Sequence, residues 1–161
     1  MGASRPADRG AELRRDPELV VWDGSLVEKP ESLALEGLRP VRSTKAVRLK
    51  RIKPGYLNPP GGRPIFVPGF QWLSVIVLEM SGPPTLAYIR WWTTMGEHKI
   101  SRRDVEGDVL AESSRRRGQR VIHVWDRGFA SRPWLLMASV HAVHFFMCWP
   151  KHYRLVDDQG R

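Results

Sequence analysis

Two apolar segments joined by a short turn constrain the fold of this chain most strongly. FQWLSVIVLEM (70–80) and TLAYIRWWTT (85–94) are rich in β-branched and aromatic residues, which favour strands over helices. Residues 81–84 between them are SGPP, a composition typical of a turn. Strands separated by so few residues pair as an antiparallel hairpin. We expect the first strand of this hairpin to be a central one.

After the hairpin the sequence alternates between helical and extended patterns. Helices are predicted over 101–117 and 131–142, where Ser101 and Ser131 can cap their first turns. Each helix is followed by an apolar strand, over 120–125 and 143–149. A hairpin followed by strand–helix–strand units predicts an α/β fold, a mixed β-sheet with helices packed on it.

The first third of the chain carries weaker signals. Residues 1–17 are polar and charged and are expected to be a flexible leader, so that 18–161 form the single domain. The apolar run 19–22 predicts a short strand, ended by a turn at Asp23-Gly24-Ser25. Residues 27–43 are expected to be mostly a connecting segment, and the alternation of apolar and basic residues over 46–52 predicts an edge or half-exposed strand.

The charge of the chain favours a polyanionic partner. Its formal net charge is +9, which favours a nucleic acid over a membrane surface as the partner. Residues 39–53 carry seven basic side chains and no acidic one; the alternative is a solvated strand face whose charges discourage edge pairing. The expected DNA contacts are Arg42, Lys45, Arg48, Lys50, Arg51 and Arg127.

The cellular location expected from the sequence is the cytoplasm. The chain has one cysteine, so it cannot form an internal disulfide, and a reducing compartment follows. The most apolar window, 134–150, is too short for a membrane span and contains two histidines. We therefore expect no membrane partner.

Two predicted strands end in the same dipeptide. LVVWDGS and VIHVWDRG both finish an apolar run with Trp-Asp, at Asp23 and Asp126. If these strands are parallel neighbours, both carboxylates emerge at one edge of the sheet, where a divalent cation relieves their repulsion. Hard oxygen ligands favour Mg²⁺ or Mn²⁺ over zinc. The simpler alternative is that each aspartate caps its own turn.

The segments around these aspartates resemble those of the DDE transposases of the insertion-sequence-4 type. VVWDGSLVEKPES is similar to the segment of the first catalytic aspartate in that family, and the stretch from VWDRGF onward is similar to that of the second. The resemblance covers the chain from about Glu18 onward. It implies an RNase H-like fold, DNA cleavage and strand transfer at transposon ends, and two bound divalent ions. Asp23 and Asp126 would be catalytic metal ligands, with Arg127 near the site as a charge partner or DNA contact.

One part of the family pattern has no counterpart here. The family's third ligand is a glutamate on a downstream helix, whereas no glutamate follows Glu112, and Asp157 and Asp158 resemble turn residues. Because 22 residues of this sequence precede Asp23, we also expect no counterpart of the family's DNA-end-binding region in it. The sequence therefore predicts a partial catalytic domain, incomplete at its C-terminus and inactive alone. Its expected partners are transposon-end DNA, another copy of the chain or a full-length transposase, at a prokaryotic nucleoid.

Two other functions remain open from the sequence. The chain could be a non-catalytic, basic DNA-binding remnant that occupies DNA or pairs with a full-length transposase. It could also be an unrelated hydrolase with two carboxylates, such as one acting on sugars, which would require one carboxyl group with a raised pKa. The net charge of +9 favours the DNA-binding alternative over the sugar hydrolase.

Overall fold

The computed structural model describes residues 17–32, 35–43, 65–154, 156 and 159 of the 161-residue chain. Its elements, in chain order, are β1 (Glu18–Glu28), β2 (Arg39–Arg42), β3 (Phe66–Leu78), β4 (Thr85–Trp92), α1 (Arg102–Arg117), a short 3-10 helix (Gly118–Arg120), β5 (Val121–Trp125), α2 (Arg132–Val140) and β6 (His144–Met147).

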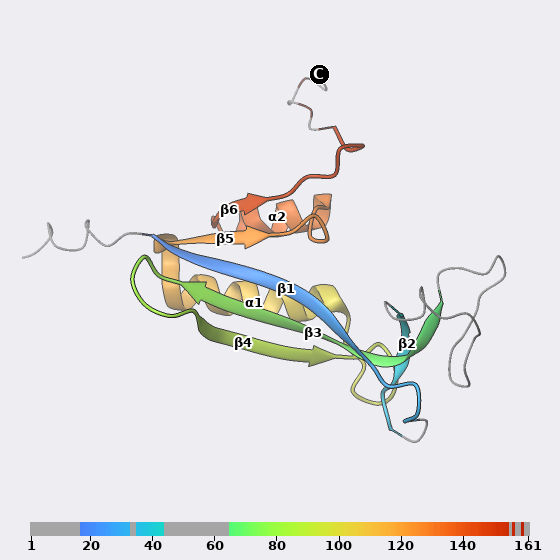
Figure 1. Ribbon diagram of the computed structural model, residues 1–161. Coiled ribbons are helices and arrows are strands. Elements are labelled where there is room, and N and C mark those ends of the chain that lie inside the picture. The colour runs from blue at the N-terminus through green and yellow to red at the C-terminus, as the bar shows by residue number, and fades with distance from the viewer. Residues whose placement is uncertain (1–16, 33–34, 44–64, 155, 157–158, 160–161) are drawn as a thin grey trace, which may run out of the picture.

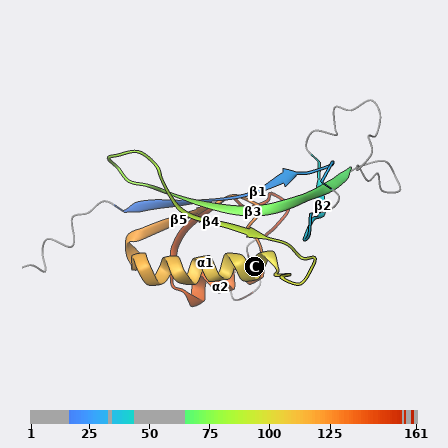
Figure 2. The same cartoon turned by 90° about the horizontal axis from the view of Figure 1, so that it is seen from below.

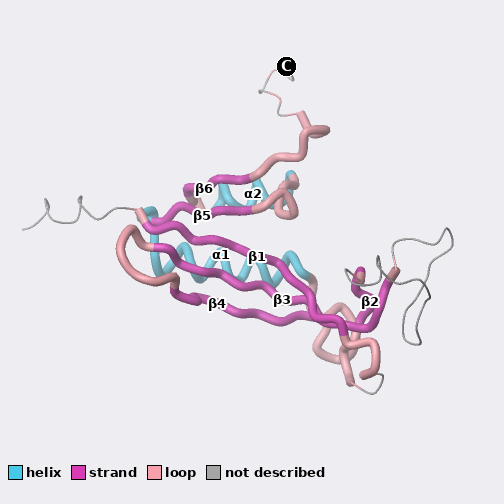
Figure 3. The backbone as a smooth tube through the Cα atoms, viewed as in Figure 1, coloured by secondary structure: helices cyan, strands magenta, loops and turns pink. Residues whose placement is uncertain are grey.

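One mixed sheet of six strands organises the described part of the chain (Figures 1 and 3). β1 lies between β3, with which it is antiparallel, and β5, with which it is parallel. β2 and β4 both pair with β3, and β6 extends the parallel side beyond β5. The expected mixed α/β sheet is confirmed, with its antiparallel and parallel halves meeting at β1.

The two helices cover the same face of the sheet (Figure 2). Ser101 caps α1 by accepting a hydrogen bond from the backbone N–H of Asp104, and Ser131 caps α2 in the same way through Trp134. α1 ends before Gly118, whose φ of 61° is a left-handed conformation that glycine adopts without steric cost. The predicted helices are therefore confirmed with their capping residues.

An aromatic core lies between the helices and the sheet. Trp22 of β1 makes edge-on contacts with rings from β5, α2 and the turn between them, and every one of these side chains is almost completely buried: Trp125, Phe129 and Trp134. Large aromatic side chains bury more apolar area than any others, and their edge-to-face contacts add to that stabilisation. This cluster holds β1 and β5 side by side.

Two predictions about the first third of the chain were wrong. β1 does not end at residue 22, since it runs through Asp23 to Glu28 and pairs with β3 over that whole length. β2, which contains Pro40, was expected to be connection; Pro40 lacks an N–H but is tolerated because β2 is paired only with β3. The predicted leader and the predicted edge strand over 46–52 lie outside the described residues, apart from Pro17.

Gly69 of β3 occupies a position that has no room for a side chain. A Cβ there would lie 2.3 Å from the carbonyl oxygen of Val27 and 2.5 Å from Cγ2 of Val41. Relieving such contacts requires the backbone of β1 to move. We expect Gly69→Ala to lower the free energy of unfolding by about 1–3 kcal/mol, as overpacking in a core does, measured by urea denaturation.

The matched control for this variant is Gly24→Ala in β1. A Cβ at Gly24 would come no closer than 3.5 Å to any atom, the nearest being Nη2 of Arg102. We expect this variant to keep the wild-type stability to within about 0.5 kcal/mol. Equal losses in the two variants would show that the close approach at Gly69 is not responsible.

Candidate metal site where β5 ends beside β1

The pairing of β1 with β5 brings the two aspartates to matching positions. The parallel ladder runs from Glu18 opposite Val121 to Val21 opposite Val124, a constant offset of 103 positions (121 − 18). The next residues, Trp22 and Trp125, remain neighbours, with ring centroids 6.2 Å apart. Asp23 and Asp126 follow them with the same offset (126 − 23 = 103). Since paired strands lie about 4.8 Å apart, the two backbones run side by side up to the residue before each aspartate.

Asp126 lies in the exposed turn that ends β5. Its Oδ1 accepts a hydrogen bond of 2.9 Å from the backbone N–H of Gly128, and its carbonyl oxygen accepts one from Phe129. This is an Asx-type turn, so Oδ1 of Asp126 caps its own turn, as the simpler alternative predicted. Within the described part of the chain no ion pair joins Asp126 to Arg127, and its other oxygen, Oδ2, remains available to a cation.

Asp23 has different surroundings, because β1 continues past it. It pairs with Ser74 of β3, whose hydroxyl donates to the carbonyl oxygen of Asp23. Trp22 points into the core. Because side chains alternate along a strand, that of Asp23 lies on the opposite side of the sheet, which neither helix covers (Figure 2). Its side chain is exposed, so both of its oxygens can reach a solvated ion.

A buried carboxylate with two arginines lies near this edge of the sheet and was not anticipated from the sequence. Glu106 of α1 is 1% exposed and accepts hydrogen bonds from Arg102 and Arg103. Arg102 also lies against the ring of Phe129, with its Cζ 5.2 Å from the ring centroid, and it approaches Gly24. Two guanidiniums thus lie on the helix side of the segment that carries the aspartates.

The sequence contained a partial signal for this group. Arg102 and Arg103 precede Glu106 by four and three residues, the spacings at which helical side chains meet. Such pairs are usually solvated, however, and their burial here depends on how α1 packs. Arg103 reaches beyond its own helix, donating to Ser131 at the start of α2 and lying over the ring of Trp134.

The expected DNA-binding residues are only partly described. Arg42 lies at the end of β2 with an exposed side chain, and Arg127 is exposed in the turn after β5. The other four expected contacts fall outside the described residues: Lys45, Arg48, Lys50 and Arg51. The structure therefore places one basic side chain, Arg127, directly beside a candidate metal ligand.

The described residues provide two carboxylates as possible metal ligands here, those of Asp23 and Asp126. Within the described ranges, no three or more His, Cys, Asp or Glu side chains are grouped so that they could hold one ion. Glu106 does not join the aspartates in such a group, and two arginines already occupy it. The donor set suits a hydrated Mg²⁺ or Mn²⁺, which keeps several waters and takes one or two carboxylates from the protein.

Comparison with protein-family profiles and with curated protein sequences finds no match to this chain. In the described part of the structure, no helix is both long enough and apolar enough to cross a membrane.

Proposed function

We propose that this chain is part of an RNase H-like catalytic domain of a DDE transposase, in which Asp23 and Asp126 are the first two ligands of the catalytic divalent ions. The single observation that carries the proposal is the parallel register of β1 and β5, which gives the two aspartates one offset of 103 positions. If the two aspartates only capped separate turns, nothing would require their separation in sequence to equal the offset between the paired strands. The sheet, with a hairpin on one side of β1 and strand–helix–strand units on the other, supports the RNase H-like part of the proposal.

The site would act on a phosphodiester of DNA at a transposon end. A bound Mg²⁺ or Mn²⁺ supplies Lewis-acid stabilisation of the phosphate oxygens and lowers the pKa of a bound water. Asp23, exposed on the open side of the sheet, offers two oxygens to the ion. Asp126 offers Oδ2, while the hydrogen bond from Gly128 to Oδ1 holds its carboxylate in a defined orientation. Arg127 would contact the DNA backbone beside the ion.

The described residues alone do not provide the full catalytic donor set of the family. Holding two ions about 3.5–4 Å apart requires more ligands than two aspartates, and the described residues add no third carboxylate to this pair. Because positioning supplies much of the rate enhancement, we expect the purified 161-residue chain to bind a divalent ion weakly without cleaving DNA.

Metal binding by the two aspartates is the direct test. We expect Mn²⁺ added to the purified chain to bind at this edge of the sheet, followed by paramagnetic broadening of the NMR signals of residues near Asp23 and Asp126. Asp126→Asn should weaken this binding by at least about tenfold, since loss of a partner that merely orients a ligand already costs that much. Asp108→Asn is the matched control, because Asp108 is an exposed carboxylate on α1.

The same samples test the expected lack of activity. A supercoiled plasmid incubated with the chain and Mg²⁺ or Mn²⁺ should remain uncut. Nicking that disappears in Asp126→Asn but persists in Asp108→Asn would show that the chain is active as it stands. Mn²⁺ binding that is unchanged in both Asp23→Asn and Asp126→Asn would refute the metal site itself.

The second candidate function is non-catalytic DNA binding. It is favoured by the incomplete donor set together with the net charge of +9. It predicts DNA binding that weakens steeply with added salt and does not change when EDTA removes divalent ions. The transposase proposal predicts instead that part of the affinity for DNA depends on the ion and on Asp23 and Asp126.

A further inference from the structure

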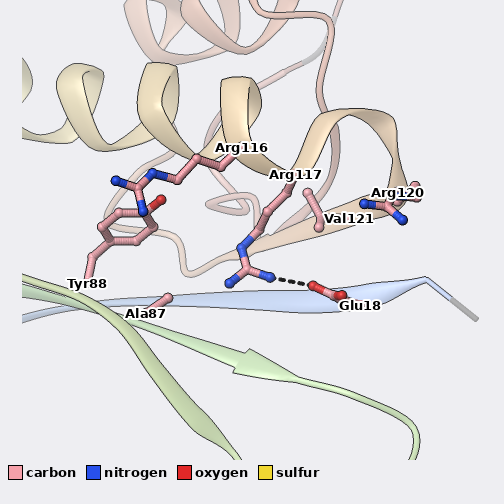
Figure 4. Close-up of a pocket in the computed structure, with 7 residues that line it drawn as sticks. All are labelled: Glu18, Ala87, Tyr88, Arg116, Arg117, Arg120 and Val121. Carbon is pink, nitrogen blue, oxygen red and sulfur yellow. Dashed lines mark hydrogen bonds and ion pairs between the residues drawn. The ribbon is translucent and has the colours of Figure 1, made fainter.

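A pocket lined by three arginines lies where β1 and β5 begin (Figure 4). Its volume is about 320 Å³. Five residue steps separate Glu18, which lines it, from Asp23, so the two sites are about 17 Å apart along the strand. The lining comes from β1, β4, the end of α1, the 3-10 helix and β5: Glu18, Ala87, Tyr88, Arg116, Arg117, Arg120 and Val121.

The charges around this pocket do not cancel. Arg117 forms an ion pair with Glu18, which is the one carboxylate in the lining. Arg116 is paired with Glu112, but Glu112 also faces Arg90. Arg120 has no ion-pair partner among the described residues. The three lining arginines and Arg90 together carry four positive charges, against two negative charges on Glu18 and Glu112. The net charge of +2 is more than the half charge at the C-terminal end of one helix can balance.

Tyr88 adds a hydrogen-bond donor to the pocket. Its side chain is 6% exposed, and its hydroxyl points toward the guanidinium of Arg116 (Figure 4). A guanidinium has no acceptor, so the phenolic O–H cannot donate to it. Within the described residues the hydroxyl has no hydrogen-bond partner. A phenolic O–H on a mostly buried residue therefore faces an electropositive cavity.

The field of these arginines also reaches the core. Arg117 is one cause of the lowered pKa of His123, after burial of the imidazole. The guanidinium of Arg117 thus lies close enough to the imidazole to disfavour its charged form.

We propose that this pocket binds a phosphate group through Arg116, Arg117, Arg120 and the hydroxyl of Tyr88. Guanidinium groups match the geometry of phosphate oxygens through paired N–H donors, and the phenolic O–H supplies one further donor. The phosphate belongs either to a nucleic-acid backbone or to a small phosphorylated molecule. This site does not depend on the metal site, since the two share no residue.

Binding of inorganic phosphate to the full chain, measured by isothermal titration calorimetry at constant ionic strength, tests the proposal. We expect saturable binding with one site, weakened about tenfold in Arg120→Gln and in Tyr88→Phe, because each variant removes a hydrogen bond to a charged group. Arg115→Gln is the matched control: it removes the same charge from the exposed last turn of α1, but Arg115 does not line the pocket. The control should bind phosphate within about twofold of the wild type.

Two results would overturn the site. One is the absence of saturable phosphate binding to a folded wild-type chain. The other is an equal loss of binding in Arg115→Gln and Arg120→Gln, which would indicate general attraction to a basic surface. Arg120 is exposed, so its replacement leaves the core intact and keeps the test valid even if Tyr88→Phe is unstable.

A DNA duplex of about 20 base pairs identifies the source of the phosphate. If the backbone is the ligand, Arg120→Gln weakens duplex binding more than Arg115→Gln does, and inorganic phosphate competes with the duplex. If Arg120→Gln loses phosphate binding while both variants bind the duplex equally, the site takes a small phosphorylated molecule. Both results support the pocket as a phosphate site and differ only in the ligand that carries the group.

Discussion

Replacing Glu106 by alanine is expected to lower the free energy of unfolding by about 3 kcal/mol. Its carboxylate is 1% exposed and accepts from Arg102 and Arg103, which join α1 to the turn after β5 and to the start of α2. Breaking a buried ion pair typically costs about 3–5 kcal/mol, because the remaining charge is left without a partner. The lower end applies here because the arginine side chains are 37% and 38% exposed.

Urea denaturation followed by far-UV circular dichroism measures this loss. Asp108→Ala is the matched control, since it removes an exposed carboxylate from the same helix and should change stability by less than about 0.5 kcal/mol. Glu106→Gln preserves the volume of the side chain but replaces one of its two accepting oxygens by an NH2 group, which cannot accept from the guanidinium that faces it, so it should lose most of the same stabilisation. A loss below about 1 kcal/mol in Glu106→Ala would contradict a structural role for this ion-pair network.

Acidification is expected to remove about 3 kcal/mol of stability through His123 alone. Burial, with a smaller contribution from the charge of Arg117, lowers the pKa of His123 from 6.5 to about 4. The unfolded chain therefore binds a proton at this histidine near pH 6.5, whereas the folded chain does so only near pH 4. The contribution of neutral His123 to the free energy of unfolding is therefore fully present above pH 6.5 and is lost progressively as the pH falls toward 4. A pKa difference of about 2.5 between the folded and unfolded chain corresponds to about 3 kcal/mol.

The hydrogen bonding of His123 explains why its charged form is disfavoured. Nδ1 accepts a hydrogen bond of 3.0 Å from Nε1–H of Trp22, so the neutral ring carries its proton on Nε2. Nε2 is buried and has no partner among the described residues. Protonating Nδ1 would break the bond to Trp22 and place a charge in the aromatic core.

Stability measured between pH 7 and pH 4 in the wild type and in His123→Gln isolates this effect. Gln can still accept from Trp22 but does not titrate, so the variant should show a pH dependence smaller by about 3 kcal/mol. His98→Gln is the control, because His98 is exposed and its replacement should leave the wild-type profile unchanged. Identical profiles for the wild type and His123→Gln would contradict the lowered pKa of His123.

Local signals in the sequence predicted most of the elements of this fold. Ser101, Ser131 and Gly118 mark the helix boundaries through hydrogen bonds and backbone conformations that involve residues only a few positions away. The hairpin of β3 and β4 follows from two strand-forming segments and the turn-like composition of residues 81–84 between them. Such features depend on near neighbours, so they can be recognised in the chain before it folds.

The extent of β1 and the burial of Glu106 could not be predicted in this way. Asp23-Gly24-Ser25 has a turn-like composition, but pairing with the long strand β3 keeps these residues extended. The spacing of Arg102, Arg103 and Glu106 indicates contact along a helix. It does not indicate that α1 packs this carboxylate under the turn after β5 and against α2.

The sequence by itself determined that Asp23 and Asp126 each follow an apolar run ending in tryptophan, and that helices and strands alternate after a hairpin. Only the tertiary structure decided that β1 and β5 are parallel neighbours with an offset of 103 positions, and that arginines from the end of α1 gather around Tyr88 of β4. The physical reason is the range of the interactions. Caps and turns form between residues within one helical turn, whereas these two sites need segments roughly 30 to 100 residues apart to pack around one shared core.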